Sequence, residues 1–360
     1  MKRRTFLLSS IAAWIIPAPR TAVRRVTTLI GTGVAGRAQN NEPVGTARLD
    51  NPFGVVIGPD DALWFCEYGS HRVLRFDMRS KIVTLIGGNG EGAYNGDGGP
   101  AIEASLNRPH EIRFDKLGNI FIAERDNHVV RKIDRGTNRI STLAGTGEAG
   151  FSGDGGPAAK AQLRQPHSIA FDRDGSLLIC DIGNHRIRRV DMKTGLINTF
   201  GGTGERLATP DGAPLRGTPL NGPRSIDIGS DGTLYLVLRE GNSVISLDPK
   251  TQRFKRLAGT GETGYSGDGG RALEATFNGP KGITCASDHS LYVSDTESHV
   301  IRRIDLKTGV ITTVMGTGQR GDGPDGDPLR CGLARPHGVF SYRDNLYVGD
   351  SETHRIRLLL

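Results

Sequence analysis

One internal repeat constrains the fold of this chain more than any other feature of its sequence. A proline marks the repeat six times at an almost constant spacing, and only the last step is shorter, by one position (Pro52, Pro109, Pro166, Pro223, Pro280 and Pro336). An aspartate follows each of the first five prolines at a fixed distance (Asp77, Asp134, Asp191, Asp248 and Asp305). A fixed period of this kind is typical of solenoids and propellers, in which each repeat is one small structural unit.

Each repeat contains four short runs with the alternating pattern of a β-strand. In the third repeat, at positions 162–201, the runs are rich in Val, Ile, Leu and Phe and are separated by Gly, Asn and Asp. This pattern indicates a four-stranded antiparallel meander. One such sheet cannot bury both of its faces alone. The six copies therefore predict an all-β, six-bladed β-propeller whose first strands start near positions 52, 109, 166, 223, 280 and 336.

The two ends of the repeated region complement each other. The last repeat reaches its third strand at residues 355–360 without a fourth. Residues 26–33 (VTTLIGTG) match the fourth strand of the fifth repeat at residues 311–318 (ITTVMGTG). We therefore expect the N-terminal strand to complete the last blade and to close the ring without a free sheet edge. A solenoid would instead need polar caps at its ends, and the sequence suggests none.

The N-terminal segment, residues 1–22, has the pattern of an export signal. A basic start (MKRR) precedes an apolar run at residues 6–16 that is too short to span a membrane. The segment RRTFL at residues 3–7 is similar to a twin-arginine export motif, and an ordinary secretory signal is the alternative. We predict a periplasmic or extracellular protein with residues 23–360 as the propeller. Cleavage near Ala18 or Ala22 and an uncleaved signal anchor both stay open.

Much of the net positive charge belongs to this N-terminal segment. Residues 1–20 contain four basic residues and no acidic residue, so their removal lowers the formal net charge from +7 to +3. Basic pairs recur in the third strands of the repeats, and we expect them to form a solvated outer stripe (Arg131-Lys132, Arg188-Arg189 and Arg302-Arg303). A nucleic-acid footprint would cluster basic and aromatic residues on one face, so no nucleic-acid partner is expected.

A histidine introduces the third strand in five of the six repeats. The pairs Asn127-His128 and Asn184-His185, with the variants Ser70-His71, Ser298-His299 and Thr353-His354, precede an Ile/Val-Arg-x-Ile/Val-Asp pattern or close variants of it. This pattern resembles the NHL repeat, and the resemblance covers essentially all of residues 23–360. It implies a propeller fold, but NHL propellers include ligand-binding sensors, protein- and RNA-binding scaffolds and a few lyases, so the fold assigns no activity. We expect the five recurring histidines to make a structural hydrogen bond within each blade.

The residue after each marker proline varies between repeats and should surround the mouth of the central channel. In blade order these residues are Phe53, His110, His167, Arg224, Lys281 and His337. Since the fold does not require their variation, we predict a ligand-binding site here. A peptide, a glycan, a small anion or a protein partner are the classes considered. The two cationic residues favour a carboxylate or a phosphate.

Second strands return to the same face and end at an acidic residue in five of six repeats. The exception is Leu238 of the fourth repeat, which is the least regular. Three of the acids follow the mouth histidines, so His110–Glu124, His167–Asp181 and His337–Asp350 are candidate pairs that would orient an imidazole. The alternative is that each acid is a repeat residue that binds the following loop.

The resemblance also implies a metal hypothesis. Peptidyl-hydroxyglycine lyases of this family hold zinc through the Pro-His position, which here corresponds to His110, His167 and His337. In those lyases the histidines come from alternate blades, whereas here they come from the second, third and sixth. Arg224 and Lys281 would also oppose a nearby cation.

Calcium is the second metal considered. Its candidate ligands are the aspartates of three Gly-Asp-Gly-Gly loops, Asp97, Asp154 and Asp268. Each loop offers one carboxylate where a calcium loop offers several, which favours a turn capped by the aspartate.

Two functions follow from these patterns. The first is an exported, non-catalytic propeller that binds a ligand or a protein at the channel mouth. The alternative is a metal-dependent lyase or hydrolase, in which the mouth histidines hold the ion, Glu124 acts as a base and Arg224 stabilises developing negative charge. The sequence lacks a nucleophile motif such as Gly-x-Ser-x-Gly, which favours the binding function.

Overall fold

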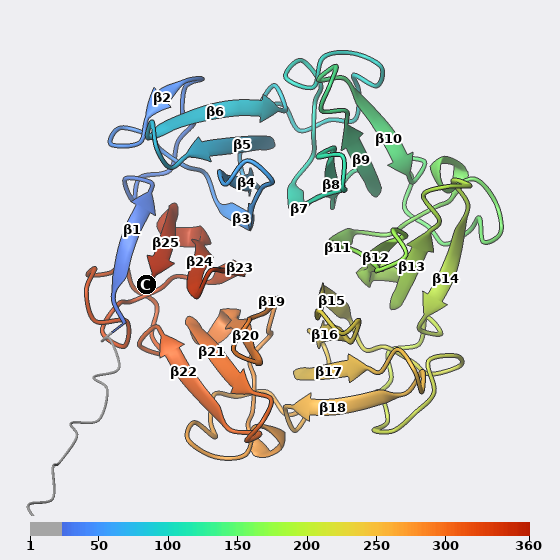
Figure 1. Cartoon of the computed structure of the whole chain (residues 1–360). Helices are drawn as coiled ribbons and strands as arrows, with labels where there is room; N and C mark the ends of the chain where they lie inside the picture. The colour runs from blue at the N-terminus through green and yellow to red at the C-terminus, as the bar shows by residue number, and fades with distance from the viewer. Residues whose placement is uncertain (1–23) are drawn as a thin grey trace, which may run out of the picture.

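Six antiparallel sheets surround a central axis as the blades of a propeller (Figure 1). The structure, a computed structural model, describes residues 24–360, and the predicted export signal at residues 1–22 lies outside the described residues. Five blades have four strands, and the first has a short additional strand at its outer edge. The predicted six-bladed propeller is confirmed.

Within each blade the strands follow one another from the axis outward (Figure 1). Blades 1 to 3 consist of β3 (Pro52–Ile57), β4 (Leu63–Glu67), β5 (Arg72–Asp77), β6 (Ile82–Gly87) and the edge strand β2 (Glu42–Pro43); β7 (Pro109–Phe114), β8 (Ile120–Glu124), β9 (Val129–Ile133) and β10 (Ile140–Ala144); and β11 (Pro166–Phe171), β12 (Leu177–Asp181), β13 (Arg186–Val190) and β14 (Ile197–Gly201). Blades 4 to 6 consist of β15 (Pro223–Ile228), β16 (Leu234–Leu238), β17 (Ser243–Leu247) and β18 (Phe254–Ala258); β19 (Gly282–Cys285), β20 (Ser290–Asp295), β21 (Val300–Asp305) and β22 (Ile311–Met315); and β23 (Pro336–Tyr342), β24 (Asn345–Asp350), β25 (Arg355–Leu359) and β1 (Val26–Ile30).

Helical structure is limited to single 3₁₀ turns in the loops. They are η1 (Ala158–Lys160), η2 (Ile182–Asn184), η3 (Ala272–Glu274), η4 (Thr296–Ser298) and η5 (Ser351–Thr353). Across residues 24–360, no helix has the length and apolar character needed to cross a membrane.

The first strand of the chain closes the ring. β1 pairs antiparallel with β25, in a register that places Val26 opposite Leu359 and Thr28 opposite Arg357. The Thr28 backbone N–H also donates to Asp325, as the equivalent N–H of Thr142 in blade 2 does to Asp97. The N-terminal strand therefore occupies the fourth-strand position of blade 6, as its sequence predicted.

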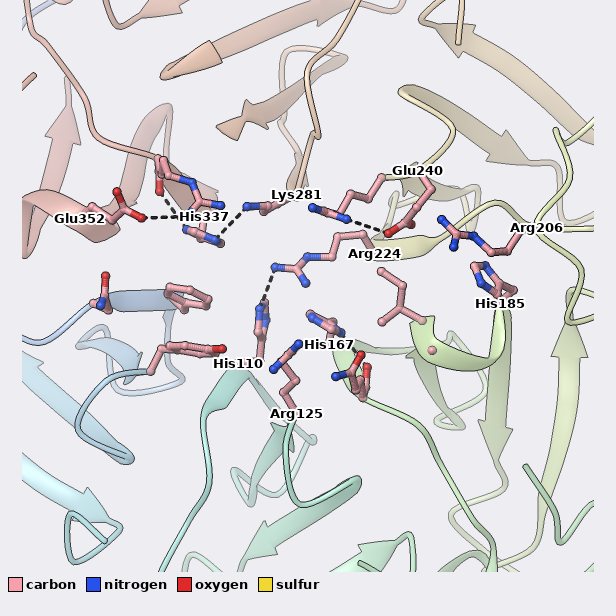
Figure 2. A pocket seen from close by; sticks show the side chains of 18 residues that line it. His110, Arg125, His167, His185, Arg206, Arg224, Glu240, Lys281, His337 and Glu352 are labelled. Atoms are coloured by element: carbon pink, nitrogen blue, oxygen red, sulfur yellow. Dashed lines mark hydrogen bonds and ion pairs between the residues drawn. The ribbon is translucent and has the colours of Figure 1, made fainter. Parts of the chain in front are cut away.

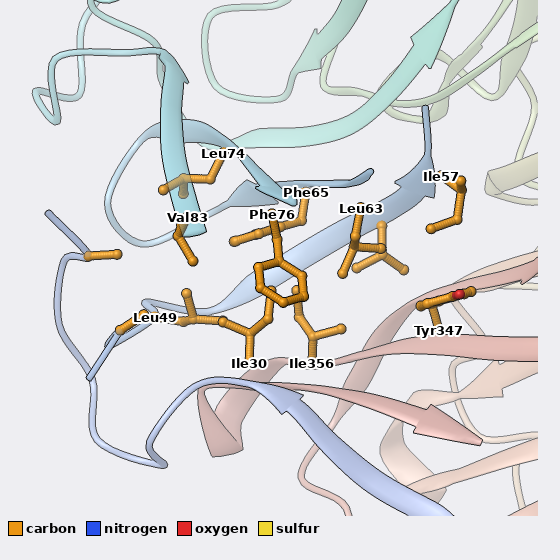
Figure 3. Packing of buried hydrophobic residues seen from close by; sticks show 13 residues of the cluster. Ile30, Leu49, Ile57, Leu63, Phe65, Leu74, Phe76, Val83, Tyr347 and Ile356 are labelled. Carbon is orange, nitrogen blue, oxygen red and sulfur yellow. The ribbon is translucent and has the colours of Figure 1, made fainter. Parts of the chain in front are cut away.

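The hydrophobic core lies between neighbouring blades. Six clusters of buried side chains each combine residues of two adjacent blades. Figure 3 shows the cluster at the seam, where Ile30 and Ile356 of blade 6 lie against Phe65 and Phe76 of blade 1. On its other face, β1 contributes Val26 to the cluster shared with blade 5. Each blade therefore depends on both of its neighbours for burial.

The third strands contain buried arginines, which corrects the expected solvated stripe. The first member of each basic pair is fully buried, and Arg357 is its counterpart in blade 6 (Arg131, Arg188, Arg302 and Arg357). Arg131 shows the shared arrangement, because Nη2 lies 2.6 Å from Oδ1 of Asp97 and Nη1 lies 3.4 Å from Oε1 of Glu124. The alternation of the strand turns this side chain inward, where two carboxylates compensate its charge. The second members, such as Arg303, face outward and are partly exposed.

The recurring histidines link neighbouring blades, which corrects the expectation of a bond within each blade. The Nδ1 atom of each accepts a hydrogen bond from the backbone N–H of the residue before the next marker proline, at 3.1–3.3 Å (His71, His128, His185, His299 and His354). In blade 4 the Oδ1 atom of Asn242 accepts the equivalent bond at 3.0 Å. All six residues have a positive φ between 40° and 59°. This link fixes the point at which each first strand begins.

We predict that the seam determines whether the propeller folds. A chain that begins at Val34 lacks β1 and should melt at a much lower temperature or aggregate, because it exposes the edge of β25 and opens two core clusters. A chain that begins at Arg24 retains β1 and is the control. Thermal denaturation followed by circular dichroism compares the two, and identical melting curves would contradict the closure.

A second prediction concerns the buried arginine of blade 2. Arg131→Met should lower the free energy of unfolding by about 3 kcal/mol, because it leaves the buried carboxylate of Glu124 without its cation. Lys132→Met, at the adjacent and partly exposed position, is the control with the same change of charge.

The sequence of blade 4 indicates which second substitution should compensate for the loss of Arg131. It has Leu238 and Ile245 at the positions of Glu124 and Arg131, and both are buried in the same cluster. The double variant Glu124→Leu/Arg131→Ile should recover most of the lost stability in urea denaturation. If the Arg131→Met variant unfolds at the wild-type urea concentration, the buried ion pair has no stabilising role.

Candidate ligand-binding site at the channel mouth

The six variable residues after the marker prolines converge on one cavity. The cavity has a volume of about 440 Å³ and lies at the mouth of the central channel (Figure 2). Its lining includes all six (Phe53, His110, His167, Arg224, Lys281 and His337). In five blades the pairing of the first two strands is irregular immediately after the proline, as between Pro109 and Glu111. Such an irregularity re-aims a side chain, here toward the mouth.

The three mouth histidines are held in one tautomer, two by backbone carbonyls and His110 by Arg224. Nδ1 of His167 lies 2.6 Å from the carbonyl oxygen of Gln165, and Nδ1 of His337 lies 2.8 Å from that of Arg335. Nε2 of His110 accepts from Arg224 Nη2 at 2.9 Å, and a guanidinium only donates. A carbonyl oxygen only accepts, so Nδ1 carries the proton and Nε2 presents a lone pair. Burial and the charge of Arg224 hold the pKa of all three imidazoles well below the usual value, and Lys281 adds to this at His110 and His337.

Arg224 lies at the centre of the mouth and has no carboxylate partner among residues 24–360. Its side chain is 6% exposed, and Nη2 donates to Nε2 of His110 at 2.9 Å. Its Nε atom is buried and has no hydrogen-bond partner within the described chain. Burial, together with Arg239 and Arg125, lowers its pKa to about 9, so the guanidinium stays charged at neutral pH. A buried and uncompensated charge of this kind is costly to a folded protein.

Lys281 is also buried but has a carboxylate partner. Its Nζ atom lies 2.8 Å from Oε1 of Glu297 and 3.3 Å from Nε2 of His337. The same Glu297 oxygen accepts from Arg335 at 2.7 Å, and Arg335 continues to Glu352 at 2.8 Å. Burial lowers the pKa of Lys281 to about 7, and the positive charge of Arg224 lowers it in the same direction. This amine is therefore poised to change charge near neutral pH.

The lining as a whole is strongly positive. Six of its eighteen residues are cationic and two are acidic (Arg125, Arg206, Arg224, Arg239, Lys281 and Arg335 against Glu240 and Glu352). The acids do not balance the cations evenly, because Glu240 pairs with Arg239 and Glu352 pairs with Arg335 and Arg320. Arg224 and Arg206 remain without an ion pair among the described residues. The side of the mouth formed by blades 2 to 4 therefore carries the excess charge.

An aromatic wall closes the opposite side of the mouth. The Phe53 ring is stacked between Tyr68, at a centroid distance of 4.2 Å, and His337, at 3.8 Å. Arg108 covers the outer face of Tyr68. Both faces of Phe53 are thus occupied, and the wall presents ring edges to the cavity. Beneath it the channel narrows to a space of about 30 Å³, and Gly338 packs so closely against the Phe53 carbonyl oxygen that a Cβ atom would clash with it.

The three carboxylates predicted to pair with the mouth histidines are turned away from the mouth. Glu124, Asp181 and Asp350 are fully buried, and none of them lines the cavity. Each accepts a backbone N–H from the loop before its own first strand and faces the buried arginine of its blade. The candidate His–carboxylate pairs are therefore wrong, and the alternative interpretation as repeat residues is correct. Burial raises the pKa of all three carboxyls.

The donor set at the mouth does not fit zinc. No group of three or more His, Cys, Asp or Glu side chains among residues 24–360 has the arrangement of a metal site. The lone pair of His110 Nε2 accepts from Arg224, and Nε2 of His337 faces the Lys281 amine. Two cationic groups thus stand where the ion would have to bind, and they repel it.

The loop aspartates proposed for calcium have cationic partners within the chain. Asp97, Asp154 and Asp268 each bind the buried arginine of the next third strand, at 2.6–2.9 Å. Asp97 additionally accepts the backbone N–H of Thr142. The guanidinium takes the position that a calcium ion would take, so these aspartates clamp the loops onto the blades.

Several residues of the lining were not predicted from the sequence. Tyr68, Arg125, Ile182 and Arg239 all follow the last residue of a second strand, and all four line the mouth. The equivalent residues of blades 5 and 6 are Thr296 and Ser351. This position varies between repeats as much as the position after the proline, and that variation is the signal that would have revealed it. Glu111 was also missed; it lies below the mouth beside Arg113, and burial raises its pKa to about 7.

Comparison with known proteins identifies the repeat. The family model of the NHL repeat matches residues 163–190, and that of the Teneurin NHL domain matches residues 255–333. The chain is 28% identical over 335 residues to the protein SUPPRESSOR OF QUENCHING 1 of Arabidopsis thaliana and 26% identical over 331 residues to the human NHL repeat-containing protein 2. These matches cover 89% and 83% of this chain but only 31% and 45% of the relatives, so the chain spans less than half the length of either.

Solved structures with the same fold are more distant in sequence. An auxiliary nutrient binding protein from Bacteroides thetaiotaomicron superimposes with a TM-score of 0.68 at 17% identity, covering 94% of this chain and 76% of that protein. A streptogramin B lyase superimposes with a TM-score of 0.56 at 14% identity, covering 94% of this chain and 97% of the lyase. At these identities the likeness concerns the fold alone. Residues 163–190 thus match the NHL repeat, and the sixfold repeat and the closed ring show that the described chain is a six-bladed β-propeller.

Proposed function

We propose that this chain is an exported binding propeller that takes a small anionic ligand at the channel mouth. The observation that carries the proposal is Arg224, a buried guanidinium with no carboxylate partner among the described residues and with an unpaired Nε atom. A ligand carboxylate or phosphate would supply the missing charge and the missing hydrogen-bond acceptor.

The surroundings of Arg224 support an anion over other ligands. Lys281, Arg125 and Arg239 add positive charge around the same cavity. Its volume of about 440 Å³ lies within the range of small-molecule sites, roughly 300–1,000 Å³. Because a low-dielectric cavity lined by one sign of charge focuses the field, it also raises the local concentration of anions.

The proposal of export rests on the signal pattern at residues 1–22. A binding role is in keeping with the fold likeness to an auxiliary nutrient binding protein. A metal-dependent lyase or hydrolase lacks support, because the mouth, within residues 24–360, does not assemble metal ligands and Glu124 is enclosed within its blade. Binding without catalysis is therefore the favoured function.

The first test removes the charge of Arg224. Arg224→Met should weaken the binding of phosphate, sulfate and succinate by about 10- to 100-fold in isothermal titration calorimetry, since a hydrogen bond to a charged group contributes roughly 1.5–3 kcal/mol. Without ligand, the variant should melt at or above the wild-type temperature, because an uncompensated buried charge is removed.

Arg303→Met is the matched control for this test. Arg303 is partly exposed on the outer part of blade 5 and pairs with Asp288. The change of charge is the same, and binding should stay at the wild-type level. The proposal fails if none of the three anions binds, or if they bind Arg224→Met as tightly as the wild type.

The second test uses the titration of Lys281. Its pKa of about 7 is far below the ordinary 10.5, so the amine is charged below pH 7 and loses its charge as the pH rises. An anion binds the charged form better, and the affinity for sulfate should therefore fall by about tenfold between pH 6 and pH 8, a window in which Arg224, with its pKa of about 9, stays mostly charged. The neighbouring His337 does not titrate in this window, because its pKa is well below the ordinary value.

Lys281→Met separates this effect from other titrations. Sulfate keeps its double charge over the whole window, so the ligand contributes no pH dependence. The variant should bind more weakly at pH 6 and show a much shallower profile, whose remaining slope comes from Glu111, the buried carboxyl below the mouth with a pKa of about 7. A wild-type profile as shallow as that of the variant would contradict a role for the amine in binding.

A further inference from the structure

Nε2 of His167 is a hydrogen-bond acceptor at the mouth that an anion alone cannot satisfy. Nδ1 of His167 donates to the Gln165 carbonyl oxygen at 2.6 Å, which leaves Nε2 as an acceptor. Among the described residues, the His167 side chain hydrogen-bonds only through Nδ1, so Nε2 is open to a ligand in the cavity. His167 stands beside the Arg224 guanidinium in the cavity (Figure 2).

The other two mouth imidazoles differ from His167 in this respect. Nε2 of His110 accepts from Arg224 at 2.9 Å, and Nε2 of His337 faces the Lys281 amine at 3.3 Å. The His110 and His167 rings lie with their centroids 4.5 Å apart. The open acceptor and the open cation therefore occupy neighbouring positions in the same part of the mouth.

We propose that the ligand carries a hydroxyl group beside its acid group, as in a hydroxy acid or a sugar acid, and that His167 Nε2 accepts a hydrogen bond from this hydroxyl. The inference rests on the proposed anion-binding function and deepens it. Arg224 binds the acid group, and the hydroxyl proton lies between the ligand and the imidazole. A ligand oxygen without a proton would face the imidazole lone pair and be repelled by it.

The protonation state of His167 supports this assignment. Burial, and then the charge of Arg224, hold its pKa well below the ordinary value, so the ring is neutral at pH 7. It therefore does not serve as a second cation for the acid group. A neutral acceptor next to a cationic donor distinguishes a hydroxy acid from a plain acid.

The rest of the lining favours a polyhydroxylated molecule over a peptide or an aliphatic acid. Only three of the eighteen lining residues are large apolar or aromatic side chains, Phe53, Tyr68 and Ile182. Both faces of Phe53 are covered, so an apolar side chain finds little surface to pack against. Asn51, Gln165 and Glu240 add polar groups suited to further hydroxyls.

The test compares three probes by calorimetry with the full propeller. D-gluconate has the charge and chain length of hexanoate but carries hydroxyls, and sorbitol has the hydroxyls without the charge. Gluconate should bind at least about tenfold more tightly than hexanoate, because a site built to bind a hydroxyl rejects an analogue that lacks it. Sorbitol should show no measurable binding.

Two substitutions of His167 assign the effect to one atom. In His167→Asn the amide nitrogen can replace Nδ1 and keep the bond to Gln165, but no atom replaces Nε2, so gluconate should lose its preference over hexanoate. In His167→Gln the amide oxygen reaches the position of Nε2, and the preference should stay within about threefold of wild type. A preference retained in His167→Asn would overturn the assignment.

The outcomes separate this inference from the proposed function. If gluconate and hexanoate bind equally and both depend on Arg224, the anion-binding function stands and the hydroxy-acid inference is overturned. If neither binds but phosphate, sulfate or succinate does, the anion-binding function again stands and the hydroxy-acid inference is overturned. If none of these five anions binds, both fail. N-acetylglycine carries an N–H beside its carboxylate, and its binding as tightly as gluconate would replace the hydroxy acid by a peptide C-terminus and overturn the inference.

Discussion

The pairing of β1 with β25 is the interaction on which the rest of this structure depends. Each blade buries its two faces against its neighbours, so a ring with an open seam would leave two of its six interfaces exposed. β1 contributes Val26 to one of them and Ile30 to the other. Closure also fixes the axis, and the axis brings six first strands together at one mouth. The cavity at the mouth is thus a consequence of the ring.

Buried arginines play two different parts in this structure, one inside the blades and one at the channel mouth. In blades 2, 3, 5 and 6 a buried arginine binds a blade carboxylate and a loop aspartate, as Arg131 does with Glu124 and Asp97. The charge is compensated, and the group holds a loop against a sheet. Arg224 is also buried but has no such partner among the described residues. A folded protein retains an uncompensated buried charge most readily where a ligand completes it.

Blade 4 shows that a blade can fold without a buried arginine between a blade carboxylate and a loop aspartate. Leu238 and Ile245 stand where the other blades have the acid and the arginine, and both pack in the apolar core. An ion pair and an apolar pair of similar volume are often nearly equivalent in stability when both partners change together. The loop aspartate survives as Asp211, which accepts the backbone N–H of Arg256. The irregularity of this blade in the sequence is therefore a repacking of its interior.

The repeat made the fold predictable, because the proline period and the four alternating runs in each repeat together indicate a six-bladed propeller. The six mouth residues were predictable for the same reason, since equivalent positions in a ring share one height along the axis. The burial of charged residues inside the blades could not be predicted from the sequence. Arg131 and Glu124 look like surface residues in a linear sequence, and their burial depends on Asp97, a loop aspartate that is distant from both along the chain. The direction of the His128 bond was hidden as well, because its partner, the backbone N–H of Gln165, carries no sequence signal.

The symmetry of the ring explains why function depends on the positions at which its copies differ. Identical side chains at a sixfold mouth would create a uniform field that holds an anion without orienting it. Here blades 5 and 6 compensate their cations through Glu297 and Glu352, whereas blades 2 to 4 leave Arg224 uncompensated within the described chain. Under the proposed function, the acid group of a ligand is therefore directed to one side of the axis, beside His167. Unequal compensation of charge would in this way let a nearly symmetric scaffold recognise an asymmetric molecule.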